Sequence, residues 1–122
     1  MESSDKVNIS EKLELIKDYW NPRIVGELNG QQVRLVKFKG NFIWHKHEEE
    51  DELFFVVDGE FTMEYRDRSI VVKEKEFIIV PRGTEHRPVA RSEVSVMLFE
   101  PMSTLNTGDQ KGEKTRDSLE KI

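Results

Sequence analysis

The chain contains three histidines, and two of them stand two residues apart. His45 and His47 fall in a stretch with the character of a β-strand, where residues i and i+2 point to the same face about 6–7 Å apart at their Cα atoms. Two imidazoles placed in this way can converge on one metal ion. Glu52 follows His47 after four residues, so it can return beside both histidines if residues 46–51 form the connection between two strands.

The third histidine, His86, lies 39 residues after His47 and just past the turn sequence Pro81-Arg82-Gly83. It can join the same site only if the fold brings this segment back to the histidine pair. A lone histidine is more often an ordinary core or surface residue, and a histidine pair beside an acidic run could be a solvated loop. Three imidazoles and one carboxylate nevertheless suit one divalent transition metal, which could be Fe, Mn, Ni, Co or Zn.

Composition removes several other kinds of site. The 122 residues carry 24 acidic and 19 basic side chains, a net charge of −5, and no cysteine. The length fits one domain. Disulfides, zinc–thiolate sites, iron–sulfur clusters and thiol nucleophiles are excluded, and the acidic balance argues against nucleic acid or an anionic membrane as a partner. The polar start, residues 1–10, lacks the apolar core of a secretory signal, so we expect a cytoplasmic protein.

Strand signals dominate the chain between its two ends. Short apolar or alternating segments are separated by turn signals such as Asn29-Gly30 and Asp58-Gly59, with no crossover helix between them. The pattern predicts an all-β fold of antiparallel strands, a sandwich or a barrel. The predicted strands cover residues 24–28, 33–38, 43–47, 53–57, 61–65, 70–73, 77–80 and 94–99.

The two ends of the chain differ from this middle part. Ser10 can cap a short helix whose apolar residues, from Ile9 to Trp20, fall on one face, and Pro22 ends it. The last residues are polar, so we expect them to be extended, loosely docked or disordered. We therefore divide the chain into an N-terminal segment with a short helix, a barrel and a polar C-terminal tail, covering residues 1–22, 23–101 and 102–122.

Over residues 24–100 the motifs resemble the two motifs of the cupins. The first is represented by Gly40, His45-Lys46-His47, Glu52 and Gly59, and the second by Pro81-Arg82-Gly83 and His86. The chain is similar to the small single-domain members, of the type grouped as mannose-6-phosphate-isomerase-like or RmlC-like. Gly40 is one residue closer to His45 than in the family motif, and Lys75 and Ala90 replace a glycine and an asparagine of the second motif.

The resemblance implies a double-stranded β-helix, or jelly-roll, barrel in which His45, His47, Glu52 and His86 bind one divalent metal ion. Its leading functional implication is a metal-dependent enzyme acting on a small polar molecule, of the dioxygenase, isomerase, decarboxylase or lyase type. The alternatives are a non-catalytic module that binds or senses a small molecule, and a purely structural metal. The resemblance also implies a homodimer, to which the predicted helix could contribute.

Further side chains could contribute to a site, although the core or the surface explains them equally well. They are the aromatic residues Phe42, Trp44 and Phe54, the proton-transfer candidates Tyr65 and Glu76, and the basic residues Arg82 and Arg87. The carboxylates of residues 48–51 could assist metal uptake or form a solvated turn. No catalytic residue can be assigned from the sequence.

Overall fold

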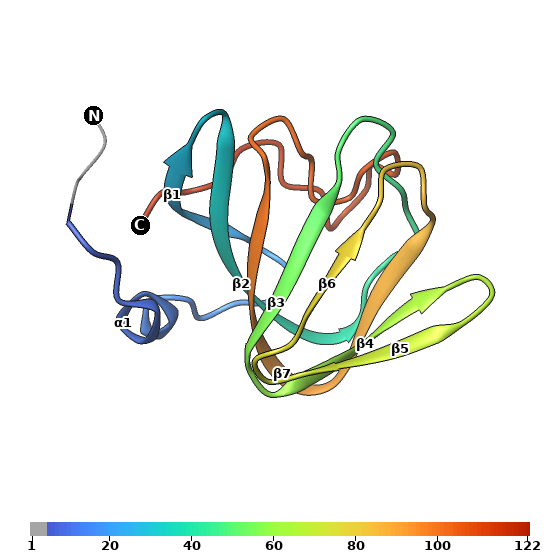
Figure 1. Ribbon diagram of the computed structural model, residues 1–122, viewed down its shortest axis with the longest axis horizontal. Coiled ribbons are helices and arrows are strands. Elements are labelled where there is room, and N and C mark those ends of the chain that lie inside the picture. Colours follow the sequence, from blue (N-terminus) through green and yellow to red (C-terminus); the bar gives the residue numbers. More distant parts are fainter. Residues whose placement is uncertain (1–4) are drawn as a thin grey trace.

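A computed structural model describes residues 5–122, so residues 1–4, the beginning of the polar segment in which we expect no secretory signal, lie outside the described part. One short helix and seven strands make up its regular structure (Figure 1). They are α1 (Ile9–Glu14), β1 (Arg23–Leu28), β2 (Gln31–Asn41), β3 (Glu52–Asp58), β4 (Glu60–Tyr65), β5 (Ser69–Lys73), β6 (Phe77–Val80) and β7 (His86–Pro101). Within residues 5–122 no helix has the length and apolar character needed to span a bilayer.

The longest strand, β7, joins the two parts of the barrel. Its second half pairs antiparallel with β2 and β3, which gives the strand order β1-β2-β7-β3-β6. Its first half pairs with β4, which in turn pairs with β5. In Figure 1 the hairpin of β4 and β5 lies at an angle to the strands of the larger part. This arrangement is the all-β jelly-roll barrel that the sequence predicts.

Alternation along the strands creates the core. Phe61, Met63 and Tyr65 of β4 are buried and point inward, while the residues between them are half-buried. Phe54 and Val56 of β3 join the same cluster from the opposite strand. Each large apolar side chain buried in this way contributes about 1.5–3 kcal/mol to stability. The apolar interior therefore fixes which face of each strand looks into the barrel.

The N-terminal helix is shorter than predicted and has a different cap. The side chain of Asn8 accepts a hydrogen bond from the Glu11 amide at 3.0 Å, so Asn8 is the N-cap and Ser10 lies inside the helix. Asn8 and Ser10 are both good capping residues, and sequence alone does not choose between them. Trp20 lies outside the helix with a positive φ of 59° and stacks on Phe38 and Phe42 in the core.

One strand prediction was wrong, and another covered only part of its strand. Residues 43–47 form no strand and share only an isolated bridge, His45 to His86, with β7. The predicted strand 94–99 lies in the second half of a strand that begins at His86. Its first half was not predicted, because Pro88 and several charged residues interrupt the strand pattern there. Gly40, with a φ of 87°, does not end β2 but lies at a shift in its register with β7.

The C-terminal tail is docked on the barrel. Thr104 and Thr107 are buried, and Lys121 forms an isolated parallel bridge with Ile24 of β1. The polar composition of this segment therefore does not prevent it from packing, because turns and hydrogen bonds hold it. The division of the chain into three parts stays a prediction.

Candidate metal centre

The four residues expected to bind a metal lie together inside the barrel. His45, His47, Glu52 and His86 each offer one ligand atom, and these atoms all lie within 4.8 Å of one another. Each of the four residues is at most 4% exposed. The group could therefore hold one metal ion, away from bulk water.

Three segments position these side chains. His45 and His47 lie in the loop between β2 and β3, and Glu52 is the first residue of β3. His86 begins β7 and exchanges two backbone hydrogen bonds with His45, at 2.9 and 3.1 Å. The Gly83 amide donates to the carbonyl oxygen of His47 at 2.7 Å, which fixes the turn before His86 against the same loop. The two motifs are thus joined by backbone pairing.

Backbone carbonyl groups orient two of the imidazoles. Nδ1 of His45 lies 2.9 Å from the Ile43 carbonyl oxygen, and Nδ1 of His86 lies 2.8 Å from that of Thr84. A carbonyl oxygen can only accept, so Nδ1 is the protonated nitrogen in both rings. In the neutral ring the lone pair then belongs to Nε2, and this arrangement is common among metal-binding histidines.

Glu52 closes the group. Its Oε1 lies 2.9 Å from Nε2 of His47 and 3.3 Å from Nε2 of His86. Because Nδ1 of His86 is the donor to Thr84, the Nε2 atom that faces Oε1 of Glu52 carries the lone pair whenever the ring is neutral. Within the described residues, three buried atoms of this group lack a hydrogen-bond partner, namely Nε2 of His47, Oε1 of Glu52 and Nε2 of His86. A cation between them would satisfy the lone pairs, so the residues fit a metal ion.

Burial and mutual contact set the charges in the group. Burial, together with the neighbouring His86, lowers the pKa of His45 to about 4. Burial also lowers the pKa of His47, but the carboxylate of Glu52, 2.9 Å from its Nε2, outweighs burial and raises it. Glu52 is buried, yet His47 and His86 hold its pKa well below the ordinary value. The group thus combines a neutral imidazole, that of His45, with an ionised carboxylate, that of Glu52, and both can receive a cation.

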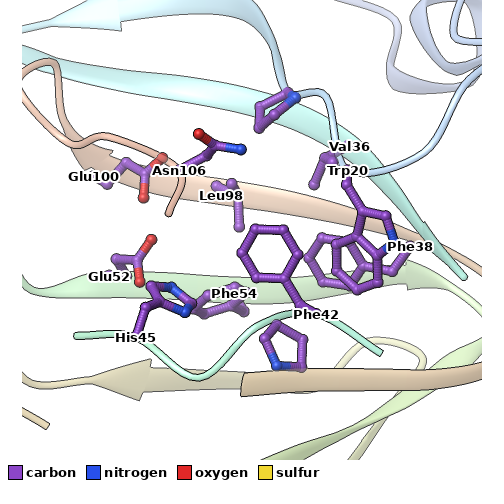
Figure 2. Close-up of a pocket in the computed structure, with 12 residues that line it drawn as sticks. Trp20, Val36, Phe38, Phe42, His45, Glu52, Phe54, Leu98, Glu100 and Asn106 are labelled. Atoms are coloured by element: carbon purple, nitrogen blue, oxygen red, sulfur yellow. The ribbon is translucent and has the colours of Figure 1, made fainter. Parts of the chain in front are cut away.

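A narrow cavity of about 30 Å³ adjoins the group. His45, Glu52, Glu100 and Asn106 form one end of it, and aromatic side chains including Trp20 and Phe38 form the other (Figure 2). A water molecule needs about 10–15 Å³ of such volume. The cavity in this conformation therefore holds about two water-sized occupants.

Glu100 and Arg34 are site residues that the sequence reading missed. Glu100 is 1% exposed, and its Oε2 accepts a hydrogen bond of 2.7 Å from Nη1 of Arg34, which is 2% exposed. Burial and the neighbouring Glu52 raise the pKa of Glu100 well above its ordinary value. The alternation of Val94, Val96 and Leu98 could have predicted that Glu100 is buried, because its continuation places Glu100 inside the barrel.

The remaining candidates divide between the cavity, the core and the surface. Phe42 and Phe54 line the cavity. Trp44 does not line it, and its ring instead stacks with the guanidinium of Arg66 at 3.9 Å. The other four candidates are not among the described residues that line the cavity. Tyr65 is buried in the core, Glu76 and Arg82 are exposed, and Arg87 pairs with Glu64 at 2.7 Å.

The acidic run is mainly a solvated turn. Glu48 and Glu49 are exposed, and Asp51 accepts a hydrogen bond of 2.8 Å from the Arg82 amide. Glu50 is half-buried with Oε1 4.0 Å from Nδ1 of His47. The run thus supplies one carboxylate to the group, Glu52, and one more beside it.

Lys75, which replaces a glycine of the second motif, keeps the backbone conformation that a glycine favours. Lys75 has a φ of 68°, the left-handed conformation that favours glycine. Its amide donates a hydrogen bond to the Val56 carbonyl oxygen at 2.9 Å, which holds the turn between β5 and β6 against β3. The turn is therefore kept at the cost of some backbone strain.

Known proteins share this fold and parts of this sequence. The family model described as a cupin domain matches residues 33–101. A cupin-2 domain containing protein from Shewanella frigidimarina NCIMB 400 is 38% identical, with a TM-score of 0.77 over 78% of this chain and 93% of that one. Protein NMB1881 from Neisseria meningitidis is 34% identical, with a TM-score of 0.74 over 80% and 99% of the two chains.

A curated relative is similar over a shorter stretch. Protein YdbB of Bacillus subtilis (strain 168), an uncharacterized protein, is 39% identical over 64 residues. The match spans 52% of this chain and 57% of the relative, so the two proteins align over little more than half of their lengths. The family match itself covers both histidine segments and Glu52, together with strands β3 to β7. The chain belongs to the cupin domain family.

Proposed function

We propose that His45, His47, Glu52 and His86 bind one divalent transition metal ion and that the protein is a metal-dependent enzyme acting on a small molecule. The observation that carries this proposal is the buried group of four ligand atoms within 4.8 Å of one another. The contact of 3.3 Å between Nε2 of His86 and Oε1 of Glu52 supports it, because a cation would satisfy the lone pairs of a neutral imidazole and the carboxylate. Fe, Mn, Ni, Co and Zn all accept such a donor set.

The cavity supports catalysis over a structural role. A bound metal ion would act as a Lewis acid, lower the pKa of bound water or activate dioxygen. His45 and Glu52 line the cavity, so a molecule inside it lies directly beside the ligands. Structural metal sites are instead usually closed and often rich in cysteine. Dioxygenase, isomerase, decarboxylase and lyase chemistry all remain compatible, and a binding or sensing module is the alternative.

The cavity wall narrows the expected substrate. Among the described residues, no lysine or arginine lines the cavity. Buried Arg34 already donates to Glu100, Gln32 and the carbonyl groups of Met102 and Thr104. Aromatic side chains form the other end of the cavity, so we propose a substrate with an apolar part.

Metal analysis of the purified protein without a histidine tag tests the proposal. Because the chain has only three histidines and no cysteine, all three imidazoles belong to this group, and bound transition metal reports on it. We expect close to one metal ion per chain, and its loss in His47→Ala with the fold retained. Glu49→Gln, a change in an exposed carboxylate of the same loop, is the matched control.

Two outcomes would contradict the proposal. Folded protein that binds none of the five metals would exclude the metal site. Loss of the fold on metal removal, with His47→Ala equally unfolded, would favour a structural metal. A metabolite screen with the metal-loaded protein then separates the alternatives, because an enzyme consumes a compound and a sensing module only binds it.

We also propose that the protein forms a homodimer through the outer face of its larger sheet. Apolar side chains lie next to one another there on three adjacent strands, with Leu53 opposite both Phe99 and Ile79, and Phe55 opposite both Met97 and Phe77. Phe77 and Ile79 are 60% and 52% exposed. An apolar patch of this kind can meet a second copy of itself around a twofold axis.

Light scattering with size-exclusion chromatography tests the dimer. We expect a dimer for the wild type and a monomer for Phe77→Glu. Leu28→Glu is the matched control, because Leu28 is 50% exposed on β1, at the opposite end of the strand order from β6. A wild-type monomer would refute the proposal, as would dissociation by both variants. The cytoplasmic location stays a prediction.

A further inference from the structure

The C-terminal tail lies directly on the loop that carries the histidine pair. Gly108 has a φ of 57°, and a methyl group on its Cα would clash with the Lys46 carbonyl oxygen and lie 3.1 Å from Cδ2 of His45. The tail backbone is therefore packed against this loop without room for a side chain. One of the four expected ligands, His45, is covered by it.

A few hydrogen bonds hold this part of the tail. The Asp109 amide donates to the Lys46 carbonyl oxygen at 3.0 Å, and Oδ1 of Asp109 accepts from the Lys46 amide at 3.1 Å. The hydroxyl of Ser103 donates to Oε2 of Glu50 at 2.8 Å. We call residues 103–109 the strap, since both its ends are bonded to the loop of residues 46–50.

The strap is also a wall of the cavity. Asn106 lines the cavity together with His45 and Glu100. Its amide groups are held by other parts of the tail, since Nδ2 donates to the Lys114 carbonyl oxygen and Oδ1 accepts from the Arg116 amide. Removing the strap would therefore open the cavity at its polar end, where the expected ligands lie.

The site needs such an opening. The four expected ligands are nearly inaccessible, and the cavity of about 30 Å³ is too small for a metabolite in this conformation. The strands around the group are held by antiparallel ladders. The bonds from Asp109 and Ser103 to the loop are instead solvent-exposed, where water competes for the same groups.

We propose that the strap is a gate over the metal group, and that it swings away from residues 46–50 to admit a metal ion and a small molecule. This rests on the proposed function, because the gate serves a site that takes up a cation. Arg34 holds the beginning of the strap through the carbonyl groups of Thr104 and of Met102, the residue just before the strap. The part that opens is accordingly residues 105–109.

Gly108→Ala tests the gate, because the added methyl group pushes the strap off the loop. Gly112→Ala is the matched control, since Gly112 lies in the same tail with nothing within 4 Å of a methyl group. We load each protein with Co²⁺, add excess EDTA and follow the loss of bound cobalt by absorbance. We expect at least tenfold faster release from Gly108→Ala, and release from Gly112→Ala within twofold of the wild type.

Hydrogen exchange of the metal-free proteins keeps the gate testable apart from the metal site. Amides of residues 105–109 should exchange at least tenfold faster in Gly108→Ala than in the wild type, with β7 unchanged. If Gly108→Ala fails to fold, Asp109→Ala serves instead, since it removes the bond to the Lys46 amide. Unchanged exchange and cobalt release in the folded variant would overturn the gate. Failure of the wild type to bind Co²⁺, with the exchange result as expected, would overturn the proposed function alone.

Discussion

Replacing Arg34 by methionine should destabilise the barrel strongly. Arg34 and Glu100 are 2% and 1% exposed, and their ion pair of 2.7 Å lies between β2 and β7. Methionine keeps much of the buried volume but leaves the Glu100 carboxyl without its partner. It also leaves the Gln32 side-chain oxygen and the Thr104 carbonyl oxygen without the hydrogen bonds that Arg34 donates.

The magnitude follows from what is left uncompensated. Removing one partner of a buried ion pair typically costs about 3–5 kcal/mol, because the other partner stays buried without compensation. Replacing both partners by apolar residues of similar size is often neutral. We therefore expect Arg34→Met to lower the free energy of unfolding by about 3–5 kcal/mol, and the double variant with Glu100→Leu to recover most of that loss.

Urea unfolding of the metal-free proteins, followed by tryptophan fluorescence and circular dichroism, measures these values. Arg23→Met is the matched control. Arg23 pairs with Asp18 at 2.8 Å, but the side chains are 14% and 45% exposed, so this loss should be about 1 kcal/mol or less. A cost below about 1 kcal/mol for Arg34→Met, or a double variant less stable than the single one, would refute the reasoning.

Three further predictions concern the metal group and the turn beside it. Metal affinity should fall as the pH drops through the raised pKa of His47, because the metal binds only the deprotonated imidazole. His45, with a pKa of about 4, is already neutral over this range. Co²⁺ titrations on both sides of neutral pH check this, and a flat profile would contradict it. Saturation with Co²⁺ at about 100 times its Kd should stabilise the wild type by about 2.7 kcal/mol in urea, but His86→Ala hardly at all; equal gains would place the metal elsewhere. Lys75→Gly should raise the free energy of unfolding by about 0.5–1 kcal/mol, since it relieves a left-handed backbone, and a less stable variant in thermal unfolding would argue against strain at this turn.

The sequence predicted which four residues lie together better than it predicted how they are positioned. The spacing of His45, His47 and Glu52 led to a group that the structure does bring together. The assumed reason was wrong, because the histidine pair lies in a loop and not on a strand. Backbone pairing of His45 with His86 orients the group instead, and such a long-range contact leaves no local pattern.

Arg34 and Glu100 were missed for a different physical reason. A charged residue in an alternating strand is ordinarily placed on the solvent face, because an unpaired buried charge is costly. Here two such residues, 66 positions apart, compensate each other, and only the pairing of β2 with β7 shows it. The polar tail was underestimated similarly, since composition does not show that Asp109 and Gly108 fit the loop at Lys46.

These two missed features are physically connected. Arg34 donates to Glu100 inside the barrel and, through the same guanidinium group, to the carbonyl oxygens of Met102 and Thr104 at the beginning of the strap. Arg34→Met should therefore also loosen the strap, and the double variant with Glu100→Leu should recover stability without recovering slow cobalt release. Recovery of both would mean that the strap depends on the barrel as a whole, and not on its own bonds to Arg34.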